Sequence, residues 1–181
     1  MYSIPSTHNI FSIPKEEIEK IGEENQIYGF PLLSGLQVLV NEILIISKFY
    51  KFNYIYGIDL GCGDGKTIDY FNKNIINSEW IGIEMSSYRI SLSLNPTNII
   101  EGNLLELDYQ NYNFIYVNNL AFDDSLSDKL ENKIFTEFTG IIFTTKPFSN
   151  LKLIKKIKKI KNVKADTNWQ KKHNFNFYLL K

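Results

Sequence analysis

Residues 56–66 bring together the residue types best suited to holding a ligand. An apolar run ends at Asp59 and is followed by glycines at alternate positions, namely Gly61, Gly63 and Gly65. Glycines lack a Cβ, so a ligand can approach the backbone N–H groups at the positive end of a following helix. The pattern predicts a strand, a tight turn and a helix start that hold a nucleoside-containing cofactor. The alternative is a glycine-rich turn that binds nothing.

Glu84 is the second residue that such a site requires. It ends the next apolar run and lies twenty-five residues after Asp59. In a strand–helix–strand unit, an acid at this place accepts the hydroxyl groups of a ribose held over the turn. A dinucleotide fingerprint would space its glycines as Gly-x-Gly-x-x-Gly, whereas the third glycine here comes two residues after the second. The form Asp-x-Gly-x-Gly-x-Gly with a strand-end acid resembles instead the first motif of S-adenosylmethionine (SAM) dependent methyltransferases.

Further residues at predicted strand ends should reach the same rim. We expect Asn103 near the adenine, and Trp80 or Leu104 could flank the adenine ring, the alternative for each being a place in the core. Asn118 ends an apolar run, where its carboxamide can accept a hydrogen bond from an incoming amine and orient the lone pair of that amine at the methyl sulfonium. Methyl transfer is an in-line displacement, which needs positioning and desolvation more than an acid–base pair. A turn is the alternative explanation for Asn118 and Asn119.

These residues need a scaffold that brings strand ends together. Apolar runs typical of strands alternate with segments of helical periodicity along the chain. The pattern predicts helices at 14–24, 32–50, 67–74, 86–94 and about 124–138, and strands ahead of the glycines and at 80–84, 98–100, 114–117, 140–144 and 174–180. Residues 1–14 are expected to form an irregular arm. Residues 151–163 fit either a helix or a strand, because isoleucine recurs there at every third position.

This alternation predicts an α/β fold with a doubly wound, mostly parallel sheet, and it places the ligand at the carboxyl ends of the strands. The last forty residues do not follow this alternation, and an antiparallel pair of strands at the C-terminal edge of the sheet fits them. At 181 residues the chain suits a single domain. Within it, we expect residues 1–30 to form an arm and a short helix, and residues 31–181 to form the catalytic domain; the family resemblance described below implies that residues 1–30 cover the cofactor.

The composition narrows the function classes. Hydrophobic residues make up 44% of the chain and aromatic residues 14%, which excludes general disorder. The lone cysteine, Cys62, cannot form an internal disulfide, and with His8 and His173 it makes no zinc site, so we expect no metal and a reducing compartment. The longest apolar region, residues 32–50, is interrupted by polar residues, and no charged leader precedes an apolar core. We therefore expect neither a membrane span nor secretion.

Positive charge is concentrated at the C-terminal end. Residues 146–181 hold eleven lysines against one acid, Asp166, a net charge of +10, so the rest of this neutral chain carries −10. The asymmetry indicates a polyanionic partner, with nucleic acid as the leading candidate. The alternative is a solvated face of an edge strand or helix. The residues expected to dock on DNA phosphates are Lys152, Lys155, Lys156, Lys158, Lys159 and Lys161.

A rarer pattern is the run Phe-Ile-Tyr-Val-Asn-Asn-Leu-Ala-Phe at residues 114–122, which precedes a predicted helix and then Thr-Thr-Lys-Pro-Phe at residues 144–148. This pair of motifs resembles the disruptor-of-telomeric-silencing (DOT) family, the non-SET methyltransferases that modify lysine in the globular core of histone H3. The likeness extends from about residue 8 to the end of the chain. Its further matches are Ser12-Ile13-Pro14, Tyr28-Gly29, residues 59–65, Glu84 and Trp169.

The resemblance implies the class I, Rossmann-like fold of SAM-dependent methyltransferases. It also implies a lysine channel lined by Asn118, in which Tyr116, Phe122 and Trp169 would lower the pKa of the lysine amine by desolvation. The residues expected to hold SAM, from the resemblance and from the glycine motif, are Ser12, Tyr28, Asp59, Gly61, Gly63, Gly65, Lys66, Glu84, Asn103, Leu104 and Asn118. The chain departs from the family where Phe30-Pro31 replace Glu-Thr, where Lys66 replaces glutamine, and where Asn103-Leu104 replace Asp-Phe.

Three functions remain open on the sequence. The first is a SAM-dependent protein-lysine methyltransferase that acts on histone H3 in a nucleosome, which implies a nuclear or other chromatin-containing compartment. The second is a methyltransferase of the same fold that acts on another protein or on a nucleic acid. Asn119 and Phe122 have the spacing of the Asn-Pro-Pro-aromatic motif of amino methyltransferases, but both prolines are missing. The third is a catalytically weak or inactive module of this fold that binds nucleosomes or DNA.

Overall fold

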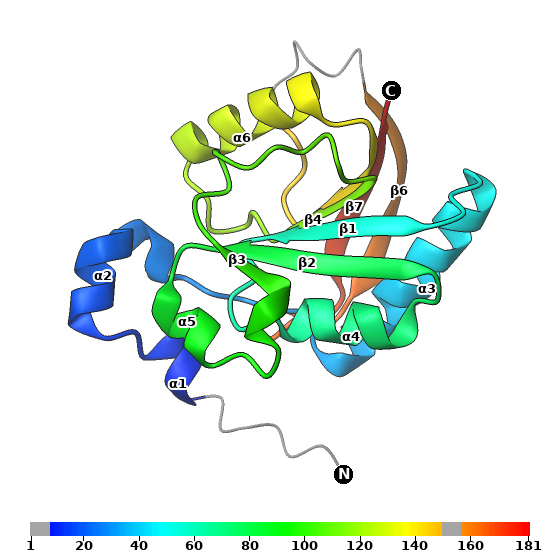
Figure 1. The fold of residues 1–181 in the computed structure, drawn as a ribbon. Helices are drawn as coiled ribbons and strands as arrows, with labels where there is room; N and C mark the ends of the chain where they lie inside the picture. Colours follow the sequence, from blue (N-terminus) through cyan, green and yellow to red (C-terminus); the bar gives the residue numbers. More distant parts are fainter. Residues whose placement is uncertain (1–7, 150–156) are drawn as a thin grey trace.

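Seven strands form one sheet within residues 8–149 and 157–181, the part of the chain that the computed structural model describes. Their order is β3-β2-β1-β4-β5-β7-β6 (Figure 1). The strands from β3 to β5 in this order are parallel, and β7 is antiparallel to both β5 and β6. The predicted α/β fold with an antiparallel C-terminal pair is therefore confirmed. The strands are β1 (Ile55–Leu60), β2 (Ser78–Glu84), β3 (Ile99–Glu101), β4 (Phe114–Val117), β5 (Gly140–Thr144), β6 (Ile157–Ala165) and β7 (His173–Leu180).

Helices cover both faces of the sheet. In Figure 1, α3 and α4 lie on one face and α6 lies on the other. The loop after β3 shares the second face with α6, because Tyr109 is fully buried in the same apolar cluster as Leu130 and Ile134 of that helix. The helices are α1 (His8–Phe11), α2 (Lys15–Ile21), α3 (Leu33–Phe49), α4 (Lys66–Asn74), α5 (Ser87–Ser91) and α6 (Asp124–Glu137).

The predicted helices differ from the observed ones mainly at their ends. The helix predicted at 14–24 stops at Ile21, because Gly22 has φ 89°, and the 3-10 turn η1 (Glu23–Gln26) follows. The helix predicted at 86–94 is only the short α5, and α1 lies inside the predicted irregular arm. In the ambiguous C-terminal run, residues 157–163 belong to a strand, and residues 151–156 lie outside the described part.

One rung of the sheet carries aromatic rings from strand to strand. Asp59, Tyr116, Phe143 and Phe177 are aligned partners on β1, β4, β5 and β7. The Tyr116 ring stacks on Phe143 with 4.9 Å between centroids, and Phe143 stacks on Phe177 with 4.8 Å. These rings pack in one buried cluster with side chains of α3 and α4. The rung therefore anchors the end of β1, from which the glycine turn starts, in the core.

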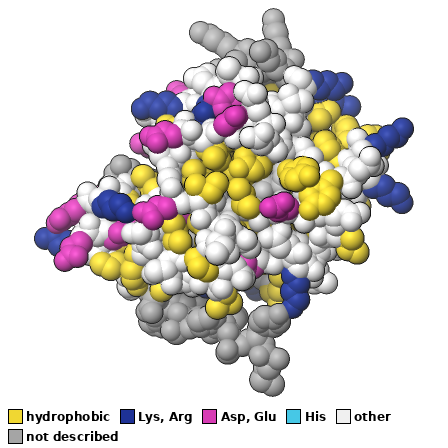
Figure 2. Space-filling view, viewed as in Figure 1, with side chains coloured by type: hydrophobic (Ala, Val, Ile, Leu, Met, Phe, Trp, Pro, Cys, Tyr) yellow, Lys and Arg dark blue, Asp and Glu magenta, His cyan; other side chains and the backbone are white. Residues whose placement is uncertain are grey.

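The segment before α3 crosses the molecule at the carboxyl ends of the strands. Acidic and basic side chains stand on α2, at the left of Figure 2, while hydrophobic side chains gather in the middle of that face. The inner side of α2 buries Ile21, and Lys20 on its surface pairs with Glu101 of β3. This docking positions the residues that follow α2 and η1. Among the described helices, none has the length and apolar character needed to cross a membrane.

Candidate active site

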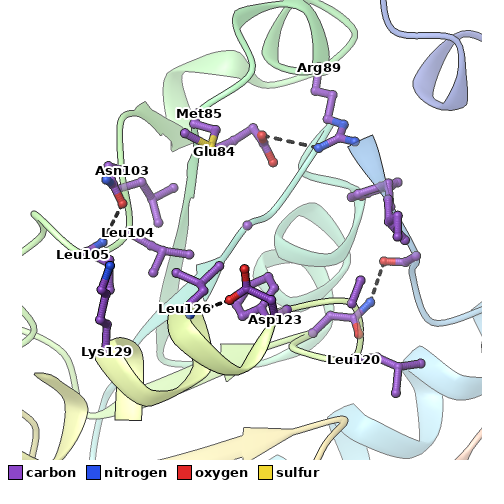
Figure 3. A pocket seen from close by; sticks show the side chains of 18 of the residues that line it. Glu84, Met85, Arg89, Asn103, Leu104, Leu105, Leu120, Asp123, Leu126 and Lys129 are labelled. Carbon is purple, nitrogen blue, oxygen red and sulfur yellow. Dashed lines mark hydrogen bonds and ion pairs between the residues drawn. The ribbon is translucent and has the colours of Figure 1, made fainter. Parts of the chain in front are cut away.

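A cavity of about 520 Å³ opens at the carboxyl ends of β1, β2, β3 and β4 (Figure 3). Its walls come from the ends of these strands, from residues 27–29, from the start of α6 and from residues 168–169 ahead of β7. Each of the stretches predicted to meet at one rim contributes to it: the glycine turn, Glu84, Gly102-Asn103 and residues 118–122. A cavity of this size suits a small-molecule ligand.

The glycine turn presents one bare position to the cavity. Gly61 has φ 81°, and a Cβ built there would meet no atom within 4 Å, so this backbone borders open space. Gly63 is covered instead, because a Cβ there would lie 2.2 Å from the ring of Tyr28. At Gly65 a Cβ would lie 3.0 Å from Ile99. Of the three glycines, Gly61 alone lines the cavity.

The N–H groups of this turn already have acceptors within the protein. Gly61 and Cys62 both donate to the carbonyl of Ile83, and Gly63 donates to Oε2 of Glu84 at 2.9 Å. This corrects the expectation that a ligand lies against free N–H groups at the helix start. The turn is not arranged as a phosphate cradle, and it offers a ligand the bare Cα of Gly61.

Glu84 holds its carboxylate in the cavity wall. The residue is 4% exposed, and its Oε1 accepts the N–H of Ser86 at 3.0 Å. Nη1 of Arg89 lies 3.7 Å from the same oxygen (Figure 3). Each carboxylate oxygen can accept more than one hydrogen bond, so Glu84 can still accept from hydroxyl groups of a ligand.

Three buried carboxylates surround the turn, and two cations face them. Asp59 and Asp64 are each 3% exposed, and Glu84 is similarly buried. Lys66 pairs with Asp64, and Arg89 pairs with Glu84. Asp59 has no ion pair among the described residues, and burial, followed by the negative charge of Glu84, holds the pKa of Asp59 well above its ordinary value. A cation bound nearby would lower this pKa and favour the charged form of Asp59.

Asn118 is clamped on the opposite wall. Its Nδ2 donates to the carbonyl of Gly29 at 2.8 Å, and its Oδ1 accepts from the hydroxyl of Thr145 at 2.8 Å. These contacts fix the carboxamide and leave it one N–H and one oxygen lone pair. Trp169 packs on Gly29, where a Cβ would lie 2.6 Å from the indole. Gly29 thus joins Asn118 and Trp169 into one wall.

The approach to this wall is apolar. Phe122 lines the cavity, as do Leu120 and Ile27, which are 44% and 70% exposed. Tyr116 is not part of the wall, contrary to the expectation. It is 2% exposed and belongs to the stacked rung, since it is in register with Asp59 on the face covered by α3 and α4.

Where the adenine is expected, the chain has Asn103 and Leu104 in place of the Asp-Phe pair of the family that it resembles. Oδ1 of Asn103 accepts the N–H of Leu105 at 2.9 Å, which leaves the amide nitrogen as a donor (Figure 3). Leu104 lines the cavity, and Lys129 of α6 also does, next to Leu105 in the view. Trp80 is fully buried, so of its two expected places it occupies the core and does not flank the adenine.

The structure brings eight of the predicted site residues to the cavity and keeps six away from its lining. Those that line it are Tyr28, Gly61, Glu84, Asn103, Leu104, Asn118, Phe122 and Trp169. Those that do not are Ser12, Asp59, Gly63, Gly65, Lys66 and Tyr116. Ser12 is exposed between α1 and α2, and Lys66 is engaged with Asp64. Tyr28 lies over the turn and donates to the carbonyl of Cys62 at 3.2 Å.

Sequence reasoning missed three residues with roles in this site: Arg89, Thr145 and Lys129. Thr145 also donates to Oδ1 of Asn119, whose carboxamide holds the backbone of Lys146. Asn119 is therefore a structural residue, and Asn118 alone of this pair lines the cavity. Composition could have pointed to Arg89, because it is the one arginine in a chain rich in lysine.

The described members of the expected DNA-docking set lie away from the cavity. Lys158 and Lys159 on β6 are exposed, but Nζ of Lys159 lies 3.4 Å from Oδ1 of Asn176, and Lys161 pairs with Glu42 of α3. The other members of the set, Lys152, Lys155 and Lys156, fall outside the described residues. Within the described part of the chain, no cluster of three or more His, Cys, Asp or Glu side chains could hold a metal ion.

No protein-family model and no curated protein sequence matches the chain. Solved structures match its fold. A mutant of MtNAS is 12% identical over 80% of this chain and 60% of that one, with a TM-score of 0.57. A complex of the mutant with SAM is 16% identical over 78% of this chain and 61% of that one, with a TM-score of 0.54. Magnesium protoporphyrin IX methyltransferase (ChlM) from Synechocystis PCC 6803 with bound SAH is 9% identical over 81% of this chain and 84% of that one, at 0.58.

At these identities the likeness shows the fold alone, which is the class I methyltransferase fold. The chain spans about 60% of the length of MtNAS.

Proposed function

We propose that this chain is a SAM-dependent methyltransferase. The observation that carries the proposal is the juxtaposition of Glu84 and Gly61 at the cavity, a buried carboxylate at the end of β2 beside the bare turn after β1. In doubly wound sheets, this place at the carboxyl ends of the strands receives a nucleoside. The SAM and SAH bound to the matching solved structures support the assignment.

The residues present fit SAM in three respects. Gly61 leaves space where a side chain would otherwise stand, and Glu84 can accept the two hydroxyl groups of a ribose. Asp59, buried beside the turn, would gain negative charge as a bound cation lowers its raised pKa. When bound, SAM supplies a methyl group on a positively charged sulfur. Asn103 and Leu104 would contact the adenine, and Tyr28 covers the turn at Gly63.

Asn118 would orient the acceptor. The lone pair that remains on its Oδ1 can accept an N–H of an amine, because Thr145 and Gly29 already fix the carboxamide. The apolar surfaces of Phe122 and Trp169 disfavour an ammonium ion, which lowers the pKa of an amine held there and keeps it nucleophilic. Positioning and exclusion of water are the contributions that this wall makes to a displacement reaction.

The finer proposal is a lysine of histone H3 in a nucleosome. Its support is the likeness of residues 114–122 and 144–148 to the DOT family, together with the wall that Asn118, Phe122 and Trp169 line. The C-terminal lysines, with Lys158 exposed on β6, would then contact nucleosomal DNA. A nuclear or other chromatin-containing compartment belongs to this proposal.

A second candidate is a methyltransferase of this fold with another protein or a nucleic acid as acceptor. It is favoured by the engagement of Lys159 and Lys161 within the chain, which weakens the case for a dedicated DNA-docking strand. The apolar approach formed by Ile27 and Leu120 carries no feature specific to histone H3.

Labelled SAM offered with nucleosomes, free histones or DNA separates these candidates. Label on nucleosomal H3 that both Asp59→Ala and Asn118→Ala abolish supports the finer proposal. Label on another acceptor supports the second candidate, and SAM binding without transfer to any of them identifies a binding module of the same fold. An absence of SAM binding contradicts the whole proposal.

A further inference from the structure

Arg89 stands out by composition before its contacts are considered. The chain has twenty Lys and Arg residues, and this is its one arginine. The other nineteen are lysines, and most of those that the structure describes are exposed, whereas the arginine is 4% exposed and lines the cavity from the short helix α5. A buried cation is costly unless several partners compensate it. Arg89 therefore needs several partners within the protein that compensate its charge.

The guanidinium of Arg89 joins the body of the protein to the segment that covers the cavity. Its Nη1 lies 3.7 Å from Oε1 of Glu84, and its Nη2 donates to the carbonyl of Gln26 at 2.7 Å. Its Cζ lies 5.2 Å from the centre of the Tyr28 ring. Glu84 belongs to β2, whereas Gln26 and Tyr28 belong to the N-terminal segment. A lysine ammonium could not reach a carboxylate, a carbonyl and a ring face at once.

Two further attachments of the N-terminal segment come from α2, while Tyr28 and Gly29 are held separately by Cys62 and Asn118. Lys20 pairs with Glu101 at 3.0 Å, with both side chains more than half exposed, and Glu17 contacts Ser87 at 3.3 Å. An exposed pair such as Lys20–Glu101 contributes little because water and salt screen it. The buried contacts of Arg89 hold residues 26–28 more strongly.

We propose that Arg89 is a positioning residue that couples ligand binding at Glu84 to the closure of residues 26–30 over the cavity. The inference rests on the proposed function for the identity of the ligand. A ribose bound to Glu84 fixes the carboxylate that orients Arg89, and Arg89 in turn fixes Gln26 and Tyr28. By linkage, closure of the segment tightens ligand binding to the same extent.

Hydrogen exchange and calorimetry with Arg89→Lys test this coupling. In the wild type, SAM should further slow the exchange of the amides of residues 26–30. In Arg89→Lys, these amides should exchange about tenfold faster without ligand, SAM should protect them less, and the SAM affinity should fall about tenfold. Lys20→Met is the matched control, because it removes an attachment of the same segment that does not touch the cavity, and it should leave both readouts unchanged.

Hydrogen exchange in β5 shows whether each variant keeps its fold. If Arg89→Lys does not fold, Tyr28→Leu takes its place, because it removes the ring that the guanidinium of Arg89 contacts. A variant that binds SAM and protects residues 26–30 as the wild type does contradicts the coupling. Equal losses in Lys20→Met contradict the special role of Arg89. If the wild type itself binds no SAM, the proposed function fails, while exchange of residues 26–30 without ligand still decides whether Arg89 holds the segment.

Discussion

At the scale of single residues, the site carries one more buried acid than it has cations. Lys66 pairs with Asp64 and Arg89 pairs with Glu84, whereas Asp59, which lies behind the cavity lining, has no ion pair among the described residues. A residue in this state lowers the stability of the ligand-free protein and raises its affinity for a cation. Stability and function should therefore respond in opposite directions when the charge is removed.

Asp59→Asn should raise the melting temperature of the ligand-free protein by a few degrees at neutral pH. Burial and then Glu84 raise the pKa of Asp59 in the folded state above its unfolded value. Below the unfolded value, near pH ~4, the group is neutral in both states and costs nothing, and the penalty grows as the pH rises through the folded value. Thermal unfolding from acid to neutral pH should show the gain shrinking toward low pH.

The same variant should lose part of the preference for SAM over SAH, because only SAM carries the sulfonium charge. A change of about tenfold corresponds to the removal of one charge interaction of about 1.4 kcal/mol. Calorimetry with both ligands measures the ratio. A variant less stable than the wild type at every pH, with an unchanged ratio, would show that Asp59 is compensated by other means.

Gly61→Ala and Gly65→Ala form a matched pair. Both glycines have positive φ, 81° and 76°, so each alanine should cost about 1–2 kcal/mol of stability. The new Cβ at Gly61 would enter the cavity, whereas the one at Gly65 would face Ile99. SAM binding should therefore fail in the first variant and largely persist in the second, as equilibrium titration of both would show. Similar binding in both would remove Gly61 from the site.

At the scale of elements, the cavity wall that Asn118, Gly29 and Trp169 form is built by segments far apart in the chain. Residues 28–30 meet the turn before β7, where the Phe30 N–H donates to Oδ1 of Asn168 and the Asn168 N–H donates to the Phe30 carbonyl. Asn118 from the end of β4 closes the same contact through Gly29. The wall therefore depends on how closely three segments approach at one glycine.

Gly29→Ala should reduce methyl transfer much more than SAM binding. A Cβ there would lie 2.6 Å from Trp169 and 3.3 Å from Nδ2 of Asn118, so the wall must shift. Glu84 and Gly61 lie on other elements and should keep their geometry, and Arg89 should still hold Gln26 and Tyr28. Transfer should fall about a hundredfold, the size expected for a misplacement near 1 Å, with SAM affinity changed less than about threefold. Equal losses in both measurements would place Gly29 in the cofactor site instead.

Local patterns in the sequence identified the strand–turn–helix at Asp59 to Lys66, because alternate glycines and an apolar run act over short distances. The same reasoning could not show that Tyr28 covers Gly63 or that Tyr116 stacks on Phe143. Those contacts depend on strand register and on packing between distant segments. Sequence spacing places a residue at a strand end, but the register decides which face it joins.

At the scale of the whole molecule, charge is segregated along the chain, with +10 in residues 146–181 and −10 elsewhere. β6 and β7 put part of that positive end at one edge of the sheet, remote in the strand order from β2 and its acids. A long polyanion could therefore contact the edge without entering the cavity. The proposed docking and the proposed catalysis should therefore be separable by mutation.

Lys158→Glu with Lys164→Glu should weaken binding to DNA or nucleosomes and flatten its salt dependence, by about one unit of the log–log slope for each phosphate that the variant no longer neutralises. Both lysines are exposed on β6. Lys48→Glu with Lys51→Glu is the control, since it changes the net charge equally at exposed positions at the end of α3. Binding isotherms over a salt series supply the slopes. Equal slopes for the two variants would show that Lys158 and Lys164 form a solvated face that does not contact DNA phosphates.

The central claim is that Glu84, beside the bare Cα of Gly61, holds SAM. Isothermal titration of the wild type and of Glu84→Gln with SAM tests it most directly, with thermal unfolding as the check that both are folded. The account predicts saturable binding at one site for the wild type and a loss of about a hundredfold in affinity for the variant, as for other buried charged hydrogen bonds. No heat with the wild type, or equal affinity in the two proteins, would contradict it.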